Sequence, residues 1–201
     1  MASPFRVVDT GQTDADAAAN AAAAAFWDWS QRPAEDHAGH LRRMADALDA
    51  NRARLVDLAA REVGAAPGWT QFNIDLALRI LHQAAGLPAL LADRQMPPAA
   101  DGSMSILRRQ AVGVVLGIAP WNAPITLAVR AIATPLACGN TVVLKGSEHC
   151  PQTHRAVVDI LNGAGLPAGV ANVVTALPDQ SRPVVNQLIA HPAVRRVNFT
   201  G

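Results

Sequence analysis

Up to residue 112, the apolar positions mostly recur at intervals of three and four residues, the spacing of amphipathic helices. Leu41, Met44, Ala45 and Leu48 are one such series. An alanine-rich segment precedes it, with two aspartates in its first turn, where the helix dipole favours negative charge. We therefore predict helices over residues 13–29, over two consecutive stretches between Pro33 and Gly64, and from residue 69 to about 92.

The pattern changes near residue 113, where short apolar runs begin to alternate with helical stretches. We predict strands starting near Val112, Thr141, Ala171 and Val194, with helices over residues 125–137, 151–164 and 182–190 between them. A more mixed segment, residues 104–111, predicts a more exposed strand before the first run. Strands that alternate with helices over short connections are typical of an α/β fold with a doubly wound parallel sheet.

Polar residues follow two of these predicted strands. Residues 112–119 are almost entirely apolar and end at a Trp121-Asn122 pair bracketed by prolines, which break the strand sharply. The second strand, residues 141–144, is followed by Lys145, Ser147 and Glu148. Ligands of open α/β sheets bind outside the carboxyl ends of the strands, so these two clusters form the candidate site.

The composition excludes several classes of protein. Half of the 201 residues are apolar and the formal net charge is +1, so nothing suggests a nucleic-acid partner. The apolar tract at residues 19–25 is too short to span a bilayer. We therefore expect a soluble, cytoplasmic protein without a membrane partner.

The cysteines and histidines indicate neither a disulfide framework nor a metal site. Only Cys138 and Cys150 occur. We expect Cys138 to be a small buried hydrophobe, whereas Cys150 precedes a predicted helix, where a lowered thiol pKa is expected. The six histidines show no metal-ligand clustering, and the pair His37 and His40 is expected on a helix surface.

Three motifs in this order resemble the aldehyde dehydrogenase superfamily. They are Pro120-Trp121-Asn122-Ala123-Pro124, Lys145-Gly146-Ser147-Glu148 and Asn198-Phe199-Thr200-Gly201. The sequence around these motifs is most similar to the branch of the family that acts on aromatic aldehydes such as salicylaldehyde and vanillin. The resemblance implies NAD(P)-dependent oxidation of a small aldehyde to its carboxylic acid, by a homo-oligomer that is a dimer or tetramer.

The resemblance assigns Asn122 to catalysis. In this family a cysteine thiolate attacks the aldehyde carbonyl, and a side-chain amide stabilises the resulting oxyanion. Asn122 matches that amide by its motif position. The alternative is an asparagine that only holds the turn between two prolines.

Other residues match the cofactor site. Lys145 and Glu148 would bind the adenine-ribose hydroxyls, which favours NAD, because the 2′-phosphate of NADP would meet a carboxylate; NADP stays an alternative. The other reading of this pair is a solvated lysine and glutamate on a loop. Ser147 suits either cofactor. The remaining expected contacts are Ile118, Ala119, Pro120 and Trp121, which would line the cofactor cleft, and Gly201, near the pyrophosphate; for Trp121, core packing is a compatible alternative.

Neither cysteine matches the context of the family's nucleophile. We expect that cysteine, and the glutamate that activates water, to lie beyond Gly201, so that this chain is the N-terminal part of a longer enzyme and inactive alone. Residues 1–102 would then be the helical N-terminal part of the cofactor-binding domain, residues 103–112 a strand leading into the sheet, and residues 113–201 the Rossmann-like βαβ half, with the catalytic domain absent. The alternatives are a non-catalytic nucleotide-binding or subunit-interaction remnant and an unrelated Rossmann-like binding module.

Overall fold

A four-stranded parallel sheet organises the computed structural model, which describes residues 11–200. Its strands run in the order β5-β4-β3-β6. Their bounds are Val114–Ile118 for β3, Thr141–Lys145 for β4, Ala171–Val174 for β5 and Val194–Phe199 for β6. The central strands β3 and β4 are buried almost throughout, as their apolar runs predict.

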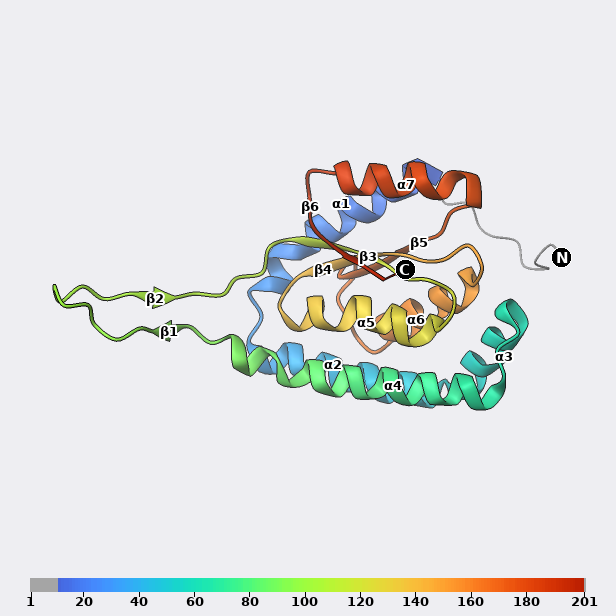
Figure 1. Ribbon diagram of the computed structural model, residues 1–201, viewed down its shortest axis with the longest axis horizontal. Helices are drawn as coiled ribbons and strands as arrows, with labels where there is room; N and C mark the ends of the chain where they lie inside the picture. The colour runs from blue at the N-terminus through green and yellow to red at the C-terminus, as the bar shows by residue number, and fades with distance from the viewer. Residues whose placement is uncertain (1–10, 201) are drawn as a thin grey trace.

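Helices cover both faces of this sheet (Figure 1). Helices α1 (Gly11–Ser30) and α7 (Pro178–Ala190) pack on one face, and α5 (Pro124–Ala137) and α6 (Pro151–Gly163) pack on the other. Helices α2 (Ala34–Ala50), α3 (Arg52–Val63) and α4 (Pro67–Gly86) form a further layer outside α5 and α6. The predicted α/β fold with a helical N-terminal segment and a doubly wound parallel sheet is confirmed.

Small residues let the layers approach closely. A Cβ atom on Gly117 of β3 would lie 2.9 Å from the Cβ atom of Ala131, so α5 packs directly against the strand. On the opposite face, the buried alanines of α1 lie over the sheet, and the hydroxyl of Thr141 donates a hydrogen bond of 2.9 Å to the carbonyl of Ala22. The N-terminal helix is therefore an integral part of the sheet's packing.

A hairpin projects from one end of the molecule and, along the chain, comes between the outer helices and the first strand of the sheet (Figure 1). After α4 comes a short 3₁₀ turn, η1 (Pro88–Leu91), and then β1 (Arg94–Gln95) and β2 (Ile106–Leu107), which pair antiparallel. The predicted helix ending near residue 92 and the predicted strand over residues 104–111 were both too long, and β1 was not predicted. Both strands are exposed, so no buried face sets their length.

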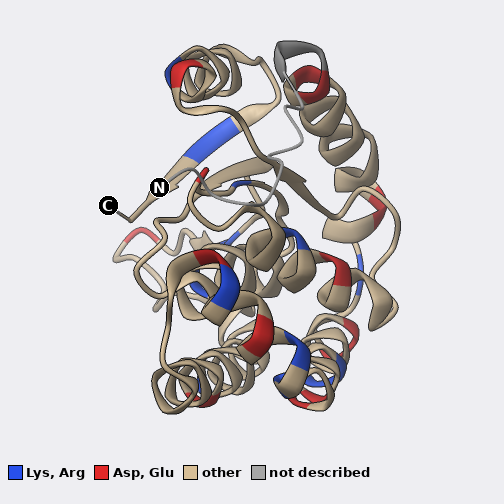
Figure 2. Ribbon diagram, turned by 90° about the vertical axis from the view of Figure 1, so that its right-hand side faces the viewer, with Lys and Arg blue, Asp and Glu red and all other residues tan. Residues whose placement is uncertain are grey.

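The edge strand β6 carries Arg195 and Arg196, and its burial is much lower than that of β3 and β4 (Figure 2). Charged side chains on an exposed edge disfavour pairing with another sheet. On the outer helices, cations and anions are interspersed and form ion pairs, among them Arg42 with Glu35 and Arg52 with Asp75. These pairs mark the solvent-facing side of that layer.

The segment Pro67–Leu91 is long and apolar enough, by length and composition, to cross a membrane. Core helices of folded domains pass the same test. Here α4 packs against α2 and α5, and the Thr126 hydroxyl of α5 donates to the carbonyl of Asn73 at 2.7 Å. That contact is the packing expected of a core helix.

Candidate functional site

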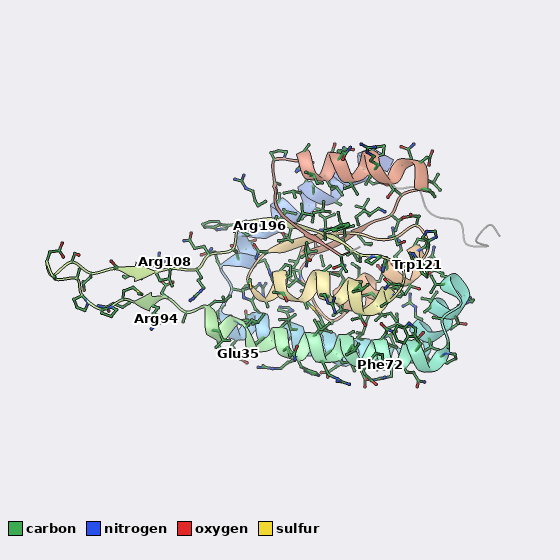
Figure 3. The ribbon with its side chains drawn as sticks, viewed as in Figure 1. Glu35, Phe72, Arg94, Arg108, Trp121 and Arg196 are labelled. Carbon is green, nitrogen blue, oxygen red and sulfur yellow. The ribbon has the colours of Figure 1, made fainter. Side chains whose placement is uncertain are left out.

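The carboxyl ends of β3 and β4 bring the two predicted polar segments together. Ile118, the last residue of β3, lies opposite Lys145, the last residue of β4, and the N–H of Ala119 donates to the Lys145 carbonyl at 3.3 Å. Beyond the strands, the rings of Trp121 and His149 meet edge to face, with centroids 5.9 Å apart. Figure 3 shows Trp121 at the opposite end of the molecule from the hairpin residue Arg94. The juxtaposition that the sequence predicted is therefore present.

Asn122 lies in a bend directly before α5, and its side chain is exposed. Proline at position 124 suits the first turn of that helix, where no backbone N–H is needed. Within the described part of the chain, the Asn122 side chain makes no hydrogen bond. An asparagine that held the turn would bond to nearby backbone, so its amide donors are available for a ligand instead.

Lys145 is buried, with 5% of its surface exposed. Its ammonium lies 3.3 Å from the Oε2 atom of Glu148, and no other hydrogen-bond partner for it occurs among residues 11–200. An ammonium has three N–H donors, and within the described residues Glu148 accepts only one of them. The alternative of a solvated lysine is wrong, and the arrangement suits a polar ligand that supplies acceptors.

Glu148 is ionised at neutral pH. Burial by itself would raise the pKa of its carboxyl, but a backbone hydrogen bond and the charge of Lys145 outweigh that effect and lower the pKa. The carboxylate is also 3.9 Å from the exposed imidazole of His149. It therefore presents acceptor oxygens at the surface of the site.

Ser147 is buried, and its polar groups bond to its own loop and to the start of α6. Its hydroxyl accepts the N–H of His149 at 3.2 Å, and its carbonyl accepts the N–H of Cys150 at 3.3 Å. Its backbone N–H donates to Nδ1 of His154 at 2.9 Å. These bonds fix the path of the loop that carries Lys145 and Glu148.

His154, in the first turn of α6, was missed by the sequence analysis. Because Nδ1 accepts the Ser147 N–H, the neutral ring carries its proton on Nε2. Burial is the main cause that lowers the pKa of His154 to about 4; the Pro124 carbonyl opposes this effect and the charge of Lys145 adds to it. A histidine four residues after Cys150, on the inward face of a predicted helix, was the available signal.

This neutral imidazole predicts a pH dependence of stability. Below pH 6.5 the unfolded chain protonates this ring but the folded chain does not, until the pH approaches 4. The free energy of unfolding should therefore fall across that window, by up to about 3 kcal/mol from this group. Urea unfolding at several pH values tests this. The dependence of the free energy of unfolding on pH should become weaker in His154→Asn and persist in His82→Asn, which changes an exposed histidine. Equal slopes in wild type and both variants would contradict this prediction.

Comparison with known proteins decides the family. A sequence model described as the Aldehyde dehydrogenase family matches residues 4–201. The chain belongs to the aldehyde dehydrogenase family. It is 49% identical over 196 residues to a vanillin dehydrogenase of Pseudomonas sp. (strain HR199 / DSM 7063), covering 98% of this chain and 40% of that protein.

Solved structures of aldehyde dehydrogenases agree with this result. The salicylaldehyde dehydrogenase of Pseudomonas putida G7, solved with salicylaldehyde, is 39% identical with a TM-score of 0.93, over 96% of this chain and 40% of that one. An NAD-dependent benzaldehyde dehydrogenase of Corynebacterium glutamicum is 31% identical with a TM-score of 0.89, over 96% and 42%. The chain thus spans about 40% of the length of the relatives that it matches.

The surroundings of both thiols in this aldehyde dehydrogenase family member raise the pKa and so disfavour the thiolate. Burial raises the pKa of Cys150 far above its ordinary value, and the charges of Glu62 and Glu148 raise it further. Burial also raises the pKa of Cys138. The expectation of a lowered pKa at Cys150 was wrong, because the start of α6 lies under other helices and beside two carboxylates.

The expectation that His37 and His40 lie on a helix surface was also wrong. Both are buried and pack against the ring of Trp29, and Nε2 of His37 donates to the Trp29 carbonyl at 3.0 Å. Burial lowers the pKa of each imidazole. Across the described residues, no group of three or more His, Cys, Asp or Glu is arranged to hold a metal ion.

The remaining predicted cofactor contacts are only partly placed. Ile118 and Pro120 are half-buried, Ala119 is buried and Trp121 is 49% exposed, so core packing does not describe Trp121. Gly201 lies outside the described residues. A cavity of about 540 Å³ lies at the other end of the sheet, where its lining includes Trp27, Arg109 and Cys138, and it contains none of these predicted residues.

Proposed function

We propose that this chain is part of an enzyme that uses NAD to oxidise an aromatic aldehyde, similar to vanillin or salicylaldehyde, to the carboxylic acid. The observation that carries this proposal is the Lys145–Glu148 ion pair after β4, together with the exposed amide of Asn122 in the loop after the neighbouring parallel strand β3. The names of the vanillin and salicylaldehyde dehydrogenases support the substrate class.

The cofactor proposal rests on the donors and acceptors at this edge. The two unused N–H donors of Lys145 suit hydroxyl oxygens, and the ionised Glu148 suits hydroxyl hydrogens, so together they match the adenine-ribose diol. Ile118, Ala119, Pro120 and Trp121 would form the neighbouring surface, and Gly201 the approach to the pyrophosphate. We propose for Ser147 the task of holding the loop. Bound NAD supplies the hydride acceptor, and NADP is the alternative cofactor.

In the reaction, Asn122 would donate its side-chain N–H to the aldehyde oxygen as negative charge develops there. Cys138 and Cys150 are unsuited to attack, because a raised pKa removes the thiolate that is the nucleophile. We propose that the attacking cysteine and the water-activating glutamate belong to the part of the relatives that this chain does not cover.

The wider setting follows from the same family. We propose a soluble, cytoplasmic homo-oligomer, a dimer or tetramer, with a small aldehyde as its substrate and no nucleic-acid or membrane partner. Its cofactor-binding domain would have three parts. The helical part would be residues 1–102, the strand that leads into the sheet would be residues 103–112, and the βαβ half would be residues 113–201.

A chimera tests this function. The chain replaces the aligned part of the Pseudomonas sp. vanillin dehydrogenase, and NADH formation from vanillin, salicylaldehyde and an aliphatic aldehyde is measured. We expect NAD-dependent turnover, fastest with an aromatic aldehyde. The proposal would be contradicted if the chimera folds but binds no cofactor and shows no turnover, while the parent enzyme is active under the same conditions. That result would favour a non-catalytic remnant.

A further inference from the structure

A fully buried histidine lies against one loop of the candidate site. His154 has no exposed surface, and its Nδ1 atom accepts the N–H of Ser147 at 2.9 Å. Nδ1 also lies 3.7 Å from the Sγ atom of Cys150, directly before α6. One imidazole therefore contacts the backbone of the loop that carries Lys145 and Glu148.

The loop lies directly against this ring. A Cβ atom on Gly146 would be 3.0 Å from Nδ1 and 3.1 Å from Cβ of His154, a contact tight enough that the imidazole would have to shift slightly. The backbone between Lys145 and Ser147 thus follows the surface of the imidazole. Its position is also fixed on the strand side, because the Gly146 N–H donates to the Val174 carbonyl at 2.9 Å.

The histidine is itself held from outside the sheet. Glu62 of α3 accepts the backbone N–H groups of Gln152 and Thr153 at 2.8 and 2.7 Å, and the Thr153 hydroxyl at 2.6 Å. A carboxylate at a helix N-terminus satisfies donors that have no partner within the helix. The first turn of α6, which carries His154, is therefore anchored independently of either loop.

We propose that His154 is a positioning residue that holds the Lys145–Glu148 loop in the conformation that binds the cofactor. This inference rests on the proposed function, because the residues that it holds in place are the proposed ribose ligands. Loss of the Nδ1 acceptor would leave the buried Ser147 N–H unsatisfied and release the loop. The loop would then have to be ordered at the moment of binding, which weakens the affinity.

Four variants of the full chain separate positioning from packing. His154→Asn keeps an acceptor oxygen near the place of Nδ1, whereas His154→Leu keeps bulk without any acceptor. In His154→Gln the side-chain amide lies near the place of Nε2, so the Ser147 N–H loses its acceptor. Val157→Ala, on the same helix and fully buried, is the matched control that lowers stability without touching either loop.

The first readout is the dissociation constant of NAD by calorimetry, beside the free energy of unfolding. We expect His154→Leu and His154→Gln to weaken NAD binding about tenfold or more, His154→Asn to stay near wild type, and Val157→Ala to lose stability but not affinity. The proposal would be overturned by any of three results. They are an affinity for NAD in His154→Leu equal to that of wild type, an equal loss of affinity in His154→Asn and His154→Gln, or a loss of affinity in Val157→Ala. If His154→Leu does not fold, the Asn and Gln variants decide.

The second readout is the hydrogen exchange of the Ser147 amide, which needs no cofactor. We expect slow exchange in wild type and His154→Asn and fast exchange in His154→Gln. If wild type fails to bind NAD but this exchange pattern holds, the cofactor proposal fails and the positioning of the loop stands. If the Ser147 amide exchanges at the same rate in all variants, the positioning inference fails whatever the result with NAD.

Discussion

Replacing Asn122 with alanine should lower the acylation rate of the chimera by on the order of 10²–10³-fold, the usual effect of losing one oxyanion donor. The exposed amide of Asn122 has no hydrogen bond within the described residues, so the substitution breaks no internal contact. Affinity for NAD should change little, because Lys145 and Glu148 lie on the neighbouring loop.

Rapid-mixing measurements of the first turnover report this rate. Asn162→Ala is the control. Asn162 lies on α6, outside the two loops, and its side-chain amide donates to the Ala171 carbonyl at 3.1 Å. Loss of this hydrogen bond should leave the acylation rate unchanged. An Asn122→Ala chimera that acylates as fast as the parent chimera would show that this amide does not stabilise the oxyanion.

Glu148→Gln should weaken NAD binding and reduce the preference for NAD over NADP by about tenfold. The ionised carboxylate is suited to accept from the ribose diol, and it would face the 2′-phosphate of NADP as a like charge. The amide removes that repulsion and one charged acceptor. Lys145→Ala should weaken both cofactors, because an ammonium serves hydroxyl and phosphate oxygens alike.

The ratio of kcat/KM for NAD to that for NADP, measured in the chimera, tests this selection. Glu35→Gln is the matched control, because Glu35 is an exposed carboxylate on α2 with its own partner, Arg42 (Figure 3). An unchanged ratio in Glu148→Gln would mean that another group selects the cofactor.

The alternating part of the fold was predictable because its strands are buried on both faces. Residues 112–119 and 141–144 are almost entirely apolar, so their identity as parallel strands and the position of the polar residues after them follow from the sequence. The position of the Asn122 loop and the Lys145–Glu148 loop at one edge of the sheet then follows from topology, since neighbouring parallel strands end at the same edge.

Other features depend on contacts that sequence patterns do not encode. The hairpin of β1 and β2 has no buried face and hence no period to detect. His37 and His40 lie on a helix whose polar residues suggest solvent, but Trp29, eight residues before His37, covers them. The position of Cys150 before a helix start predicted a lowered thiol pKa, whereas burial, together with the charges of Glu62 and Glu148, raises it.

The support under the site was hidden for the same reason. His154 accepts a hydrogen bond from the backbone N–H of Ser147, seven residues earlier in the chain. Glu62 accepts one from the backbone N–H of Gln152, ninety residues later. Neither distance leaves a local pattern, so only the packing of α3 against α6 shows how the loop after β4 is held.

The central claim is that NAD binds at the carboxyl ends of β3 and β4. Titration of the ¹⁵N-labelled chain with NAD, followed by backbone amide shifts, tests it most directly. We predict saturable shifts at the amides of Ala119, Trp121 and Asn122 and of residues 145–149, and at the indole of Trp121. Shifts centred instead on the cavity around Trp27, Arg109 and Cys138, or an absence of shifts at the strand ends, would contradict it.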